Sequence, residues 1–336
     1  MSAGHILQRL LLVIPTLFGV AVVVFVLLRV VPGNPIAMMT PPGASAADIE
    51  QLKALYGFDK SIVEQFTLWL SGLLQGDLGT SISLRQSVVE LILGRLPATL
   101  ELCLLASLMA TILCLMFSMA GSYRPRGIVS RFVDLLVSIM QAVPDFLWAL
   151  LLILMLGVAW PWFPISGRIN PRLDYDFSTQ FYLLESILRL DGGMVLHLMH
   201  HLFLPTLALA LPMAGIVTRL LKTSLVDTLQ QEYITMARAR GFSRWHVLSK
   251  EALRNATIPT LALGGVQLTF LIGGTVLVER IFGYPGIGNM AISAVIQRDL
   301  PLIQGLVLTF AALFIIINLL VDLLYAKLNP RLRSGG

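Results

Sequence analysis

Long blocks of apolar residues alternate with shorter polar segments along the whole chain. Six of these blocks are about 19 to 27 residues long, the length that an α-helix needs to cross the hydrocarbon core of a bilayer. They occupy residues 10–28, 99–119, 132–158, 202–221, 258–278 and 302–325. The short apolar–polar alternation typical of a β-barrel is not seen in the sequence. The pattern therefore predicts an all-α membrane protein with six transmembrane helices.

Composition supports the same fold class. The chain has 336 residues, of which 56% are hydrophobic and only 13% are charged. An average soluble domain has about a quarter charged residues, so this chain has too few to cover a soluble globule of its size. The first apolar block is longer than the core of a signal peptide and is not followed by a small-residue cleavage site. We therefore expect a retained first helix.

Lysine and arginine residues near the ends of the blocks predict the orientation of the helices. They gather after the second block, after the fourth block and in the tail, at Arg124, Arg126, Arg131, Lys222, Arg238, Arg240, Arg244, Lys250, Arg254, Lys327, Arg331 and Arg333. With six spans, these segments and the N-terminus fall on one side, which the positive-inside rule makes cytoplasmic. The net charge of +5 then belongs to membrane-flanking loops, not to a nucleic-acid site.

The opposite side receives longer segments. In the first, residues 30–98, an amphipathic stretch at 46–56 follows Ser45, a suitable N-cap, and an apolar stretch at 62–74 is expected to lie against the membrane or other helices. The second outer segment, residues 159–201, is rich in aromatic residues. Its tryptophans suit a membrane interface.

The segment between the fourth and fifth blocks predicts a helix, a glycine hinge and a second helix. Residues 232–240 are good helix formers, and Gly241 fits the left-handed position that commonly ends a helix. Ser243 can cap a second helix that runs through residues 251–256. Pro259 follows, near the start of the fifth span.

Two interpretations of this segment remain open from its residues. It is compatible with an ordinary basic loop that obeys the positive-inside rule. A loop needing only charge, however, does not require the small residues Ala237 and Ala239 or the glycine turn. Small side chains allow a partner to approach closely, and a short helix can lie in a groove of a cytosolic protein.

The same segment resembles a known family. Tyr233-Ile234-x-x-Ala237-Arg238-Ala239-Arg240-Gly241, followed by Ala252-Leu253-Arg254-Asn255-Ala256-x-x-Pro259, resembles the coupling-loop motif of binding-protein-dependent ABC permeases of the peptide/nickel branch. Further motifs agree in the family's order: Gly76-Asp77-Leu78-Gly79-Thr80-Ser81, Leu96-Pro97-Ala98-Thr99-Leu100-Glu101-Leu102, Glu279-x-x-Phe282-x-x-Pro285-Gly286-x-Gly288, Arg298-Asp299-x-Pro301-x-x-Gln304-Gly305, and Asn318-Leu319-Leu320-Val321-Asp322-Leu323-Leu324-Tyr325 with Asn329-Pro330-Arg331. Three positions depart from the usual pattern: Asn34 replaces Asp, Met236 replaces Ala and Glu251 replaces His.

The resemblance implies the fold of a type I ABC importer permease. The first helix and an extracytoplasmic segment would occupy residues 1–96, a five-helix transmembrane domain residues 97–326, and a cytoplasmic tail residues 327–336. The coupling loop would be residues 222–257. The residues implied to couple to an ATPase are Glu232, Tyr233, Ala237, Arg238, Ala239, Arg240 and Gly241. Those implied in an extracytoplasmic gate or binding-protein contact are Glu279, Phe282, Pro285 and Gly286.

It also implies partners and a function. The partners would be a second homologous permease, two ATPase subunits and an extracytoplasmic substrate-binding protein, in the plasma membrane of a bacterium with both termini cytoplasmic. This chain would bind no cofactor, because ATP and Mg would sit on the ATPase subunits. The expected function is to form the pore of an ATP-driven importer of dipeptides or oligopeptides, with nickel or another small solute as the alternative cargo. A secondary transporter driven by an ion gradient is the alternative from another class, but its repeated halves with broken helices are not evident.

Other chemistry is weaker in the sequence. Gly283 and Gly288 have the spacing of a phosphate loop, but Asn289 and Met290 stand where Lys and Ser or Thr are required. No nucleotide site is therefore expected. His197, His200 and His201 have the helical spacing of metal ligands, yet no carboxylate lies within a turn, and the edge of an interfacial helix explains them equally.

Charged residues within or beside the spans are functional candidates by default. They are Asp134, Asp145, Arg219, Glu279 and Asp322. The resemblance favours structural roles for most of them, with Asp322 expected near the cytoplasmic surface. Pro144, which precedes Asp145, is expected to kink the third span.

Overall fold

The computed structural model describes residues 3–30, 45, 50, 59–173 and 175–328. These residues are mostly helical, and the one β-bridge among them joins Thr80 to Ser87. The chain divides into two compact units. Unit 1 is built on Pro97–Asn289 and the chain from Ile316 onward, and unit 2 on Ile6–Leu96 and Met290–Ile315.

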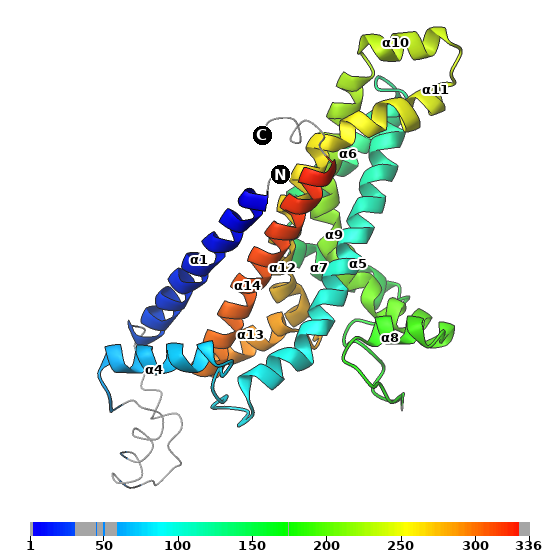
Figure 1. Ribbon diagram of the computed structural model, residues 1–336. Helices are drawn as coiled ribbons and strands as arrows, with labels where there is room; N and C mark the ends of the chain where they lie inside the picture. Colours follow the sequence, from blue (N-terminus) through cyan, green and yellow to red (C-terminus); the bar gives the residue numbers. More distant parts are fainter. Residues whose placement is uncertain (1–2, 31–44, 46–49, 51–58, 174, 329–336) are drawn as a thin grey trace. The chain divides into compact units, whose positions relative to one another are not determined.

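Unit 1 is organised around α9, Gly192–Thr228. This helix packs against α6, α7, α8 and α12, and it is the most buried of the membrane-length helices. The remaining helices are α5 Val88–Tyr123, α6 Ile128–Ala142, α7 Asp145–Leu152, the π-helix η1 Ile153–Ala159, α8 Tyr182–Leu188, α10 Glu232–Ala239, α11 Arg244–His246, the π-helix η2 Val247–Ala252 and α12 Leu253–Ile281. Figure 1 shows α10 and α11 at one end of this unit and α8 at the other.

Two helices continue from unit 1 into unit 2 or back: α13, Ile287–Ile296, and α14, Leu300–Leu328. Unit 2 also contains α1, Ala3–Val30, and α4, Ile62–Leu74, together with the first residues of α5. The apolar stretch predicted at 62–74 is therefore a helix. The amphipathic helix predicted at 46–56 falls almost entirely outside the described residues.

Within unit 2, polar side chains fix the loop before α5. The Asp299 carboxylate accepts hydrogen bonds from the hydroxyls of Ser81 and Ser83, at 2.6 and 2.7 Å, and from the Ser83 backbone N–H at 2.9 Å. At α4, Ser61 and Glu64 form a reciprocal capping box that satisfies free backbone donors at the start of the helix. The capping box and the Asp299 hydrogen bonds thus stabilise segments that lie between α1 and α5 along the chain.

Five described helices are long and apolar enough to cross a membrane. They contain the first, second, fourth, fifth and sixth predicted spans. The third predicted span, residues 132–158, is broken: it is the pair α6 and α7–η1, bent by 105° at the break, and with this pair taken as one span the described helices give the predicted six. Pro144 lacks a backbone N–H, and Val143 before it is extended, so the helix stops at the position where Pro144 was expected to kink it.

Candidate functional site

The segment from α10 to α12 follows the predicted local pattern at its start. Helix α10 covers Glu232–Ala239, and Gly241 has a φ of +83°. The N–H of Gly241 donates to Arg238 O at 3.0 Å and that of Phe242 to Ala237 O at 3.4 Å, which uses carbonyls left free at the helix end. Ser243 Oγ accepts from the His246 N–H at 3.2 Å. The predicted helix, glycine stop and serine cap are confirmed.

The predicted second helix is confirmed over residues 251–256, and in the structure it continues into the fifth span. Helices α11, η2 and α12 follow one another without a gap, and Pro259 lies inside α12. Helix η2 has the i→i+5 hydrogen-bond pattern of a π-helix, and the α-helical pattern resumes at Leu253. The segment that follows Gly241 and the fifth span therefore form one uninterrupted helical stretch.

Helix α10 is attached to unit 1 by its inner face. Ile234 and Ala237 are buried in a cluster that also contains Leu225 of α9 and Leu248 of η2. Tyr233 Oη accepts a hydrogen bond from Asn255 Nδ2 at 2.7 Å, which adds a polar contact to α12. Any force on α10 therefore reaches α9 and α12 through direct packing.

The structure separates the predicted coupling residues into two groups. Ala237 is buried against the chain's own helices, so its small side chain is needed for internal packing. The other six are exposed: Glu232, Tyr233, Arg238, Ala239, Arg240 and Gly241. Met236 is also exposed, at 67%. The outer face of α10 is thus free to meet a partner.

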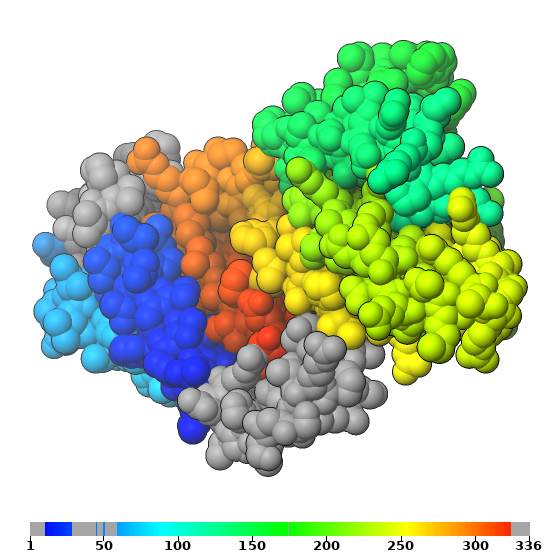
Figure 2. All heavy atoms as spheres, turned by 90° about the horizontal axis from the view of Figure 1, so that it is seen from above, coloured from blue at the N-terminus to red at the C-terminus, as the bar shows by residue number. Residues whose placement is uncertain are grey.

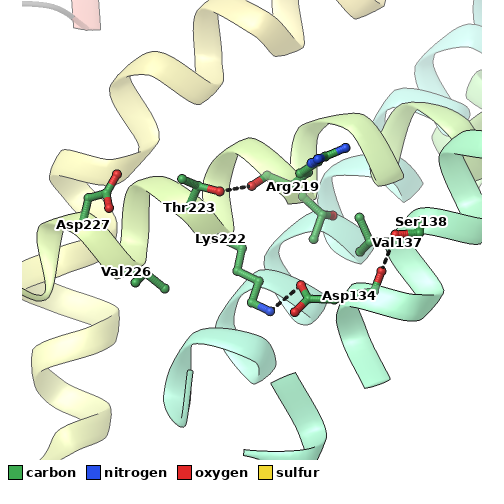
Figure 3. A pocket seen from close by; sticks show the side chains of 9 residues that line it. Asp134, Val137, Ser138, Arg219, Lys222, Thr223, Val226 and Asp227 are labelled. Carbon is green, nitrogen blue, oxygen red and sulfur yellow. Dashed lines mark hydrogen bonds and ion pairs between the residues drawn. The ribbon is translucent and has the colours of Figure 1, made fainter. Parts of the chain in front are cut away.

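A polar cavity lies between α6 and α9. It has a volume of about 380 Å³, and Figure 3 shows Lys222 directed at Asp134. Lys222 Nζ lies 2.5 Å from Asp134 Oδ1 and 3.1 Å from Ser130 O. A Cβ at Gly121 would lie 3.0 Å from Lys222 Cε, so a small residue leaves room for this side chain. Asp134 therefore joins α6 to α9 through this ion pair.

The opposite end of unit 1 contains a buried carboxylate. Glu279, at the end of α12, has no exposed surface, and it accepts hydrogen bonds from Thr99 Oγ1 at 2.6 Å and from the Asn289 N–H at 3.0 Å. Thr99 Oγ1 in turn accepts from the Ile287 N–H at 2.9 Å. This network ties the α12–α13 turn to α5. Local sequence signals missed it because its members are about 180 residues apart.

The glycines of this turn are required by close approach. A Cβ at Gly286 would lie 2.3 Å from Glu279 Oε1, and one at Gly288 would lie 2.6 Å from Val276 Cα. Phe282 is also buried, so of the four residues predicted as a gate or binding-protein contact only Pro285 is exposed. The buried Glu279 carboxylate stabilises the turn by hydrogen bonds, and Gly286 and Gly288 allow the backbone to approach it closely.

A second ion pair beside this turn was not foreseen. Arg168 Nη2 lies 2.5 Å from Glu101 Oε2, and both side chains are buried. The N–H of Leu183, at the start of α8, donates to Glu101 Oε1 at 3.0 Å, and the Arg168 guanidinium lies 3.9 Å above the Tyr182 ring. The pair therefore anchors the α7–α9 connection to α5.

Glu185 on α8 organises the rest of that connection. Its carboxylate accepts from the Thr179 hydroxyl at 2.6 Å, from two backbone N–H groups and from Arg189. The hydrogen bond from Thr179 is the largest influence, and with the backbone donors and Arg189 it outweighs burial and lowers the pKa of Glu185 to about 2. The carboxylate is therefore ionised at neutral pH.

The three histidines at the start of α9 contact the preceding loop. His200 Nε2 lies 2.7 Å from Trp162 O, and His197 Nε2 accepts from the Asn170 N–H at 3.2 Å. Among the described residues, no group of three His, Cys, Asp or Glu residues is placed to hold a metal ion. The geometry therefore gives these rings contacts typical of an interfacial helix edge.

An apolar cavity of about 370 Å³ opens between α5, α9, α12 and α14 in unit 1. Among the described residues, no charged side chain lines it. Its hydroxyl groups donate to carbonyls of their own helices, at Ser107, Thr111, Thr257 and Thr260. The wall is consequently neutral, and its polar groups are already satisfied.

Comparison with known proteins matches the chain along nearly its whole length. The family model for the binding-protein-dependent transport system inner membrane component matches residues 103–334, and the model for the N-terminal part of such membrane components matches residues 3–103. The chain is 36% identical over 332 residues to the oligopeptide transport system permease protein AppB of Bacillus subtilis, covering 98% of this chain and 99% of the relative.

Two further relatives are similar to the same extent. The di/tripeptide transport system permease protein DppB of Pseudomonas aeruginosa is 35% identical over 335 residues, with 98% of each chain covered. The dipeptide transport system permease protein DppB of Escherichia coli is 35% identical over 332 residues, also with 98% of each chain covered.

Proposed function

The chain belongs to the family of binding-protein-dependent transport system inner membrane components, and from this premise we propose that it forms the pore of an ATP-driven importer of dipeptides or oligopeptides. The observation that carries the proposal is full-length similarity to permeases named for oligopeptide, di/tripeptide and dipeptide transport. The secondary-transporter alternative loses its basis, because family members are permease components that work with a binding protein.

The neutral cavity between α5, α9, α12 and α14 supports peptide cargo. Peptides differ in the charge of their side chains, and a charged wall would favour some cargo and retain other cargo. The cavity has no charged lining residue, and its hydroxyls bond to their own helices. It therefore offers a surface over which side chains of either sign meet no fixed charge.

The exposed face of α10 is the proposed contact with two ATPase subunits that hydrolyse ATP. Tyr233, Met236 and Arg240 lie on that face, while Ile234 fixes the helix to α9 and η2. ATP-driven closure of the ATPases would move α10, and the packed cluster would pass the movement to α9 and α12. Such rigid-body motion of packed helices is a common route to alternating access.

The remaining partners follow from the family's mode of transport. A second, homologous permease would complete the pore, and a substrate-binding protein would deliver the peptide on the side of α8 and the α12–α13 turn. The family supports a location in a bacterial plasma membrane, and the Lys and Arg distribution supports an orientation with the α10 end and both termini in the cytoplasm. ATP and Mg would be bound by the ATPase subunits, and this chain would carry no cofactor.

Reconstitution tests the proposal directly. The purified complex is placed in liposomes with its cognate binding protein, and uptake of a labelled dipeptide is measured with ATP on the side of the ATPases. We expect uptake that requires both ATP and the binding protein. Uptake of nickel in place of peptide would overturn the substrate assignment, and uptake driven by an ion gradient without ATP would overturn the mechanism.

A further inference from the structure

A basic cavity lies beside α10, between the α5–α6 turn and the start of α11. It has a volume of about 680 Å³ and is lined by four arginines and no acidic residue. The arginines are Arg124, Arg126, Arg238 and Arg244. Figure 2 shows this face of unit 1, where the α5–α6 turn and the α10–α11 segment lie side by side. The four guanidinium groups are exposed, and together they give the cavity a positive potential that attracts anions.

These arginines have little compensation from their own chain. Arg238 makes one long hydrogen bond, of 3.4 Å, to Leu229 O, and Arg244 lies 5.8 Å from the centre of the Tyr123 ring. Within the described residues, no ion pair joins any of the four to a carboxylate. The nearby acidic residues Asp134 and Asp227 line the neighbouring cavity with Lys222.

A buried hydroxyl supplies a second and independent observation. Ser122, at the end of α5, also lines the basic cavity and is only 1% exposed. Its Oγ has no hydrogen-bond partner within the described part of the chain. A buried polar group without a partner destabilises a fold, so such groups in native proteins commonly meet a ligand or a water. Here the missing partner fits a ligand in the cavity.

The surroundings indicate that this ligand lies at the membrane surface. Tyr123 ends the membrane-length helix α5 and contacts the exposed Trp245, with their ring centres 6.4 Å apart. Aromatic pairs of this kind gather at the level of lipid headgroups. Immediately beyond the cavity, α6 begins with the exposed apolar residues Ile128, Val129 and Phe132. A molecule seated there has cationic groups for its head and an apolar helix face for its tails.

We propose that this cavity binds the phosphate group of an anionic phospholipid headgroup in the leaflet that faces α10. Arginine is well suited to phosphate because its planar guanidinium donates two parallel hydrogen bonds. Basic pockets between membrane helices on the cytoplasmic side are a recognised form of lipid-binding site. The Ser122 hydroxyl donates to a phosphate or glycerol oxygen of the same headgroup.

The lipid would also connect α10 to the turn between α5 and α6. Arg238 belongs to α10, whereas Arg124 and Arg126 belong to the turn between α5 and α6. A headgroup that bridges them restrains α10 relative to the membrane helices, so anionic lipid raises coupling of ATP hydrolysis to transport. This consequence rests on the proposed function; the binding of lipid does not.

Lipid retention provides the test, and it needs no transport assay. The full-length protein, purified with its accompanying subunits, is placed in nanodiscs of phosphatidylcholine with or without phosphatidylglycerol, and the lipid that stays bound after detergent exchange is counted by native mass spectrometry. We expect phosphatidylglycerol to be retained and phosphatidylcholine to be lost. Arg124→Gln with Arg126→Gln should weaken retention about 25-fold, because each surface arginine contributes roughly fivefold.

Matched variants separate a local site from general charge. Arg131→Gln with Lys250→Gln removes the same charge from exposed residues on the same side that do not line the cavity, and it should retain lipid like the wild type. Ser122→Ala should leave thermal stability in phosphatidylcholine unchanged or higher, yet reduce the stabilisation by phosphatidylglycerol severalfold. Ser118→Ala is its control, since Ser118 Oγ already donates to Cys114 O and lies outside the cavity.

Three results would overturn the proposal. The first is equal retention of phosphatidylglycerol by wild type and by the double variant of Arg124 and Arg126. The second is binding of inorganic phosphate, added to the detergent-solubilised protein, with no preference for phosphatidylglycerol over phosphatidylcholine. The third is loss of copurifying subunits from that double variant while its lipid retention is unchanged, which would make the cavity a protein docking surface.

Discussion

The two ends of unit 1 use similar turn residues for different purposes. At one end, α10 stops at Gly241, with a φ of +83°; at the other, α12 stops at Gly283, with a φ of +55°. A Cβ would meet no atom within 4 Å at either Gly241 or Gly283, but the outer turn also contains Gly286, where a Cβ would collide with the buried Glu279 carboxylate. The outer turn is therefore packed against the interior of unit 1, whereas the turn at Gly241 is exposed.

The attachment of the two turns differs in the same way. The α10 helix is held by one apolar face and keeps its other face exposed. The α12–α13 turn is held by Glu279, Thr99 and Tyr284, and Tyr284 Oη also donates to Ala98 O at 3.2 Å. Burial raises the pKa of Tyr284, so its hydroxyl remains a donor. We therefore expect damage at the outer turn to affect folding, and damage at α10 to affect coupling.

The largest effect is expected from Glu279→Ala. It leaves the Thr99 hydroxyl and the Asn289 N–H without their buried acceptor, which costs about 2–4 kcal/mol because these bonds go to a carboxylate. Thermal unfolding of the purified protein should begin roughly 5–10 °C lower. Glu90→Ala, at an exposed position in the first turn of α5, is the control and should unfold like the wild type. An unchanged midpoint for Glu279→Ala would mean that the network does not hold the turn.

The next effect is expected from Gly241→Val. Because a Cβ meets no neighbour there, the cost is backbone strain alone, about 1–2 kcal/mol at a positive φ. The variant should insert normally, since its apolar spans are untouched, but α10 should be misplaced. We expect near-normal amounts in the membrane, poor peptide uptake, and ATP hydrolysis that loaded binding protein no longer stimulates.

Gly94→Ala provides the control for this glycine. Its Cβ also meets nothing within 4 Å, but its φ is not positive. It should transport like the wild type. Normal coupling by Gly241→Val would show that the conformation of Gly241 has no part in transmitting movement, and the segment would then be an ordinary basic loop.

A smaller effect should come from the exposed face of α10. Ala239→Asp adds a charge without disturbing the buried cluster, so it should weaken retention of the ATPases severalfold during purification. Ala237 is unsuitable for this purpose, because an acid there would be buried within the chain itself. Ala239→Ser, small and neutral, is the matched control. Full retention of the ATPases by Ala239→Asp would place the docking surface elsewhere.

The sequence allowed prediction wherever the cause is local. Helix formers followed by Gly241 and Ser243 predicted α10, its stop and the next cap, because these signals act within one or two turns. The membrane spans followed from apolar length, five of them as single helices and the third as the bent pair α6 and α7–η1. Pro144 predicted an interruption but not the 105° bend, since the packing of α7 against α9 and α12 also determines its direction.

Contacts between distant residues could not be predicted in the same way. Glu279 was singled out by motif, but its partner Thr99 lies 180 residues away, and the Glu101–Arg168 pair is 67 residues apart. The sequence also suggested that Ala237 faces a partner, whereas the fold turns it inward. Which face of a short helix is buried depends on neighbours that only the assembled fold brings together.

The smallest effect concerns pH and the α8 end of unit 1. The folded pKa of Glu185 is about 2, below the ordinary value of 4.5, chiefly through the hydrogen bond from Thr179. A lowered carboxyl pKa stabilises the fold above the unfolded pKa, and this contribution is lost as pH falls toward the folded value. Thermal stability should therefore be insensitive to Glu185 ionisation from pH 8 to about 5 and decline below about 4.5.

Comparison of variants isolates this contribution from other carboxylates. Thr179→Val removes the largest influence on the Glu185 pKa and moves the folded pKa up toward 4.5, so its decline should begin at the same pH as that of the wild type but be smaller and end at a higher pH. Glu185→Gln cannot ionise at this position, so the difference between it and the wild type should shrink as pH falls from about 4.5 toward 2. A difference that stays constant over that range would show that Glu185 stabilises the loop by shape and hydrogen bonding alone, independently of its charge.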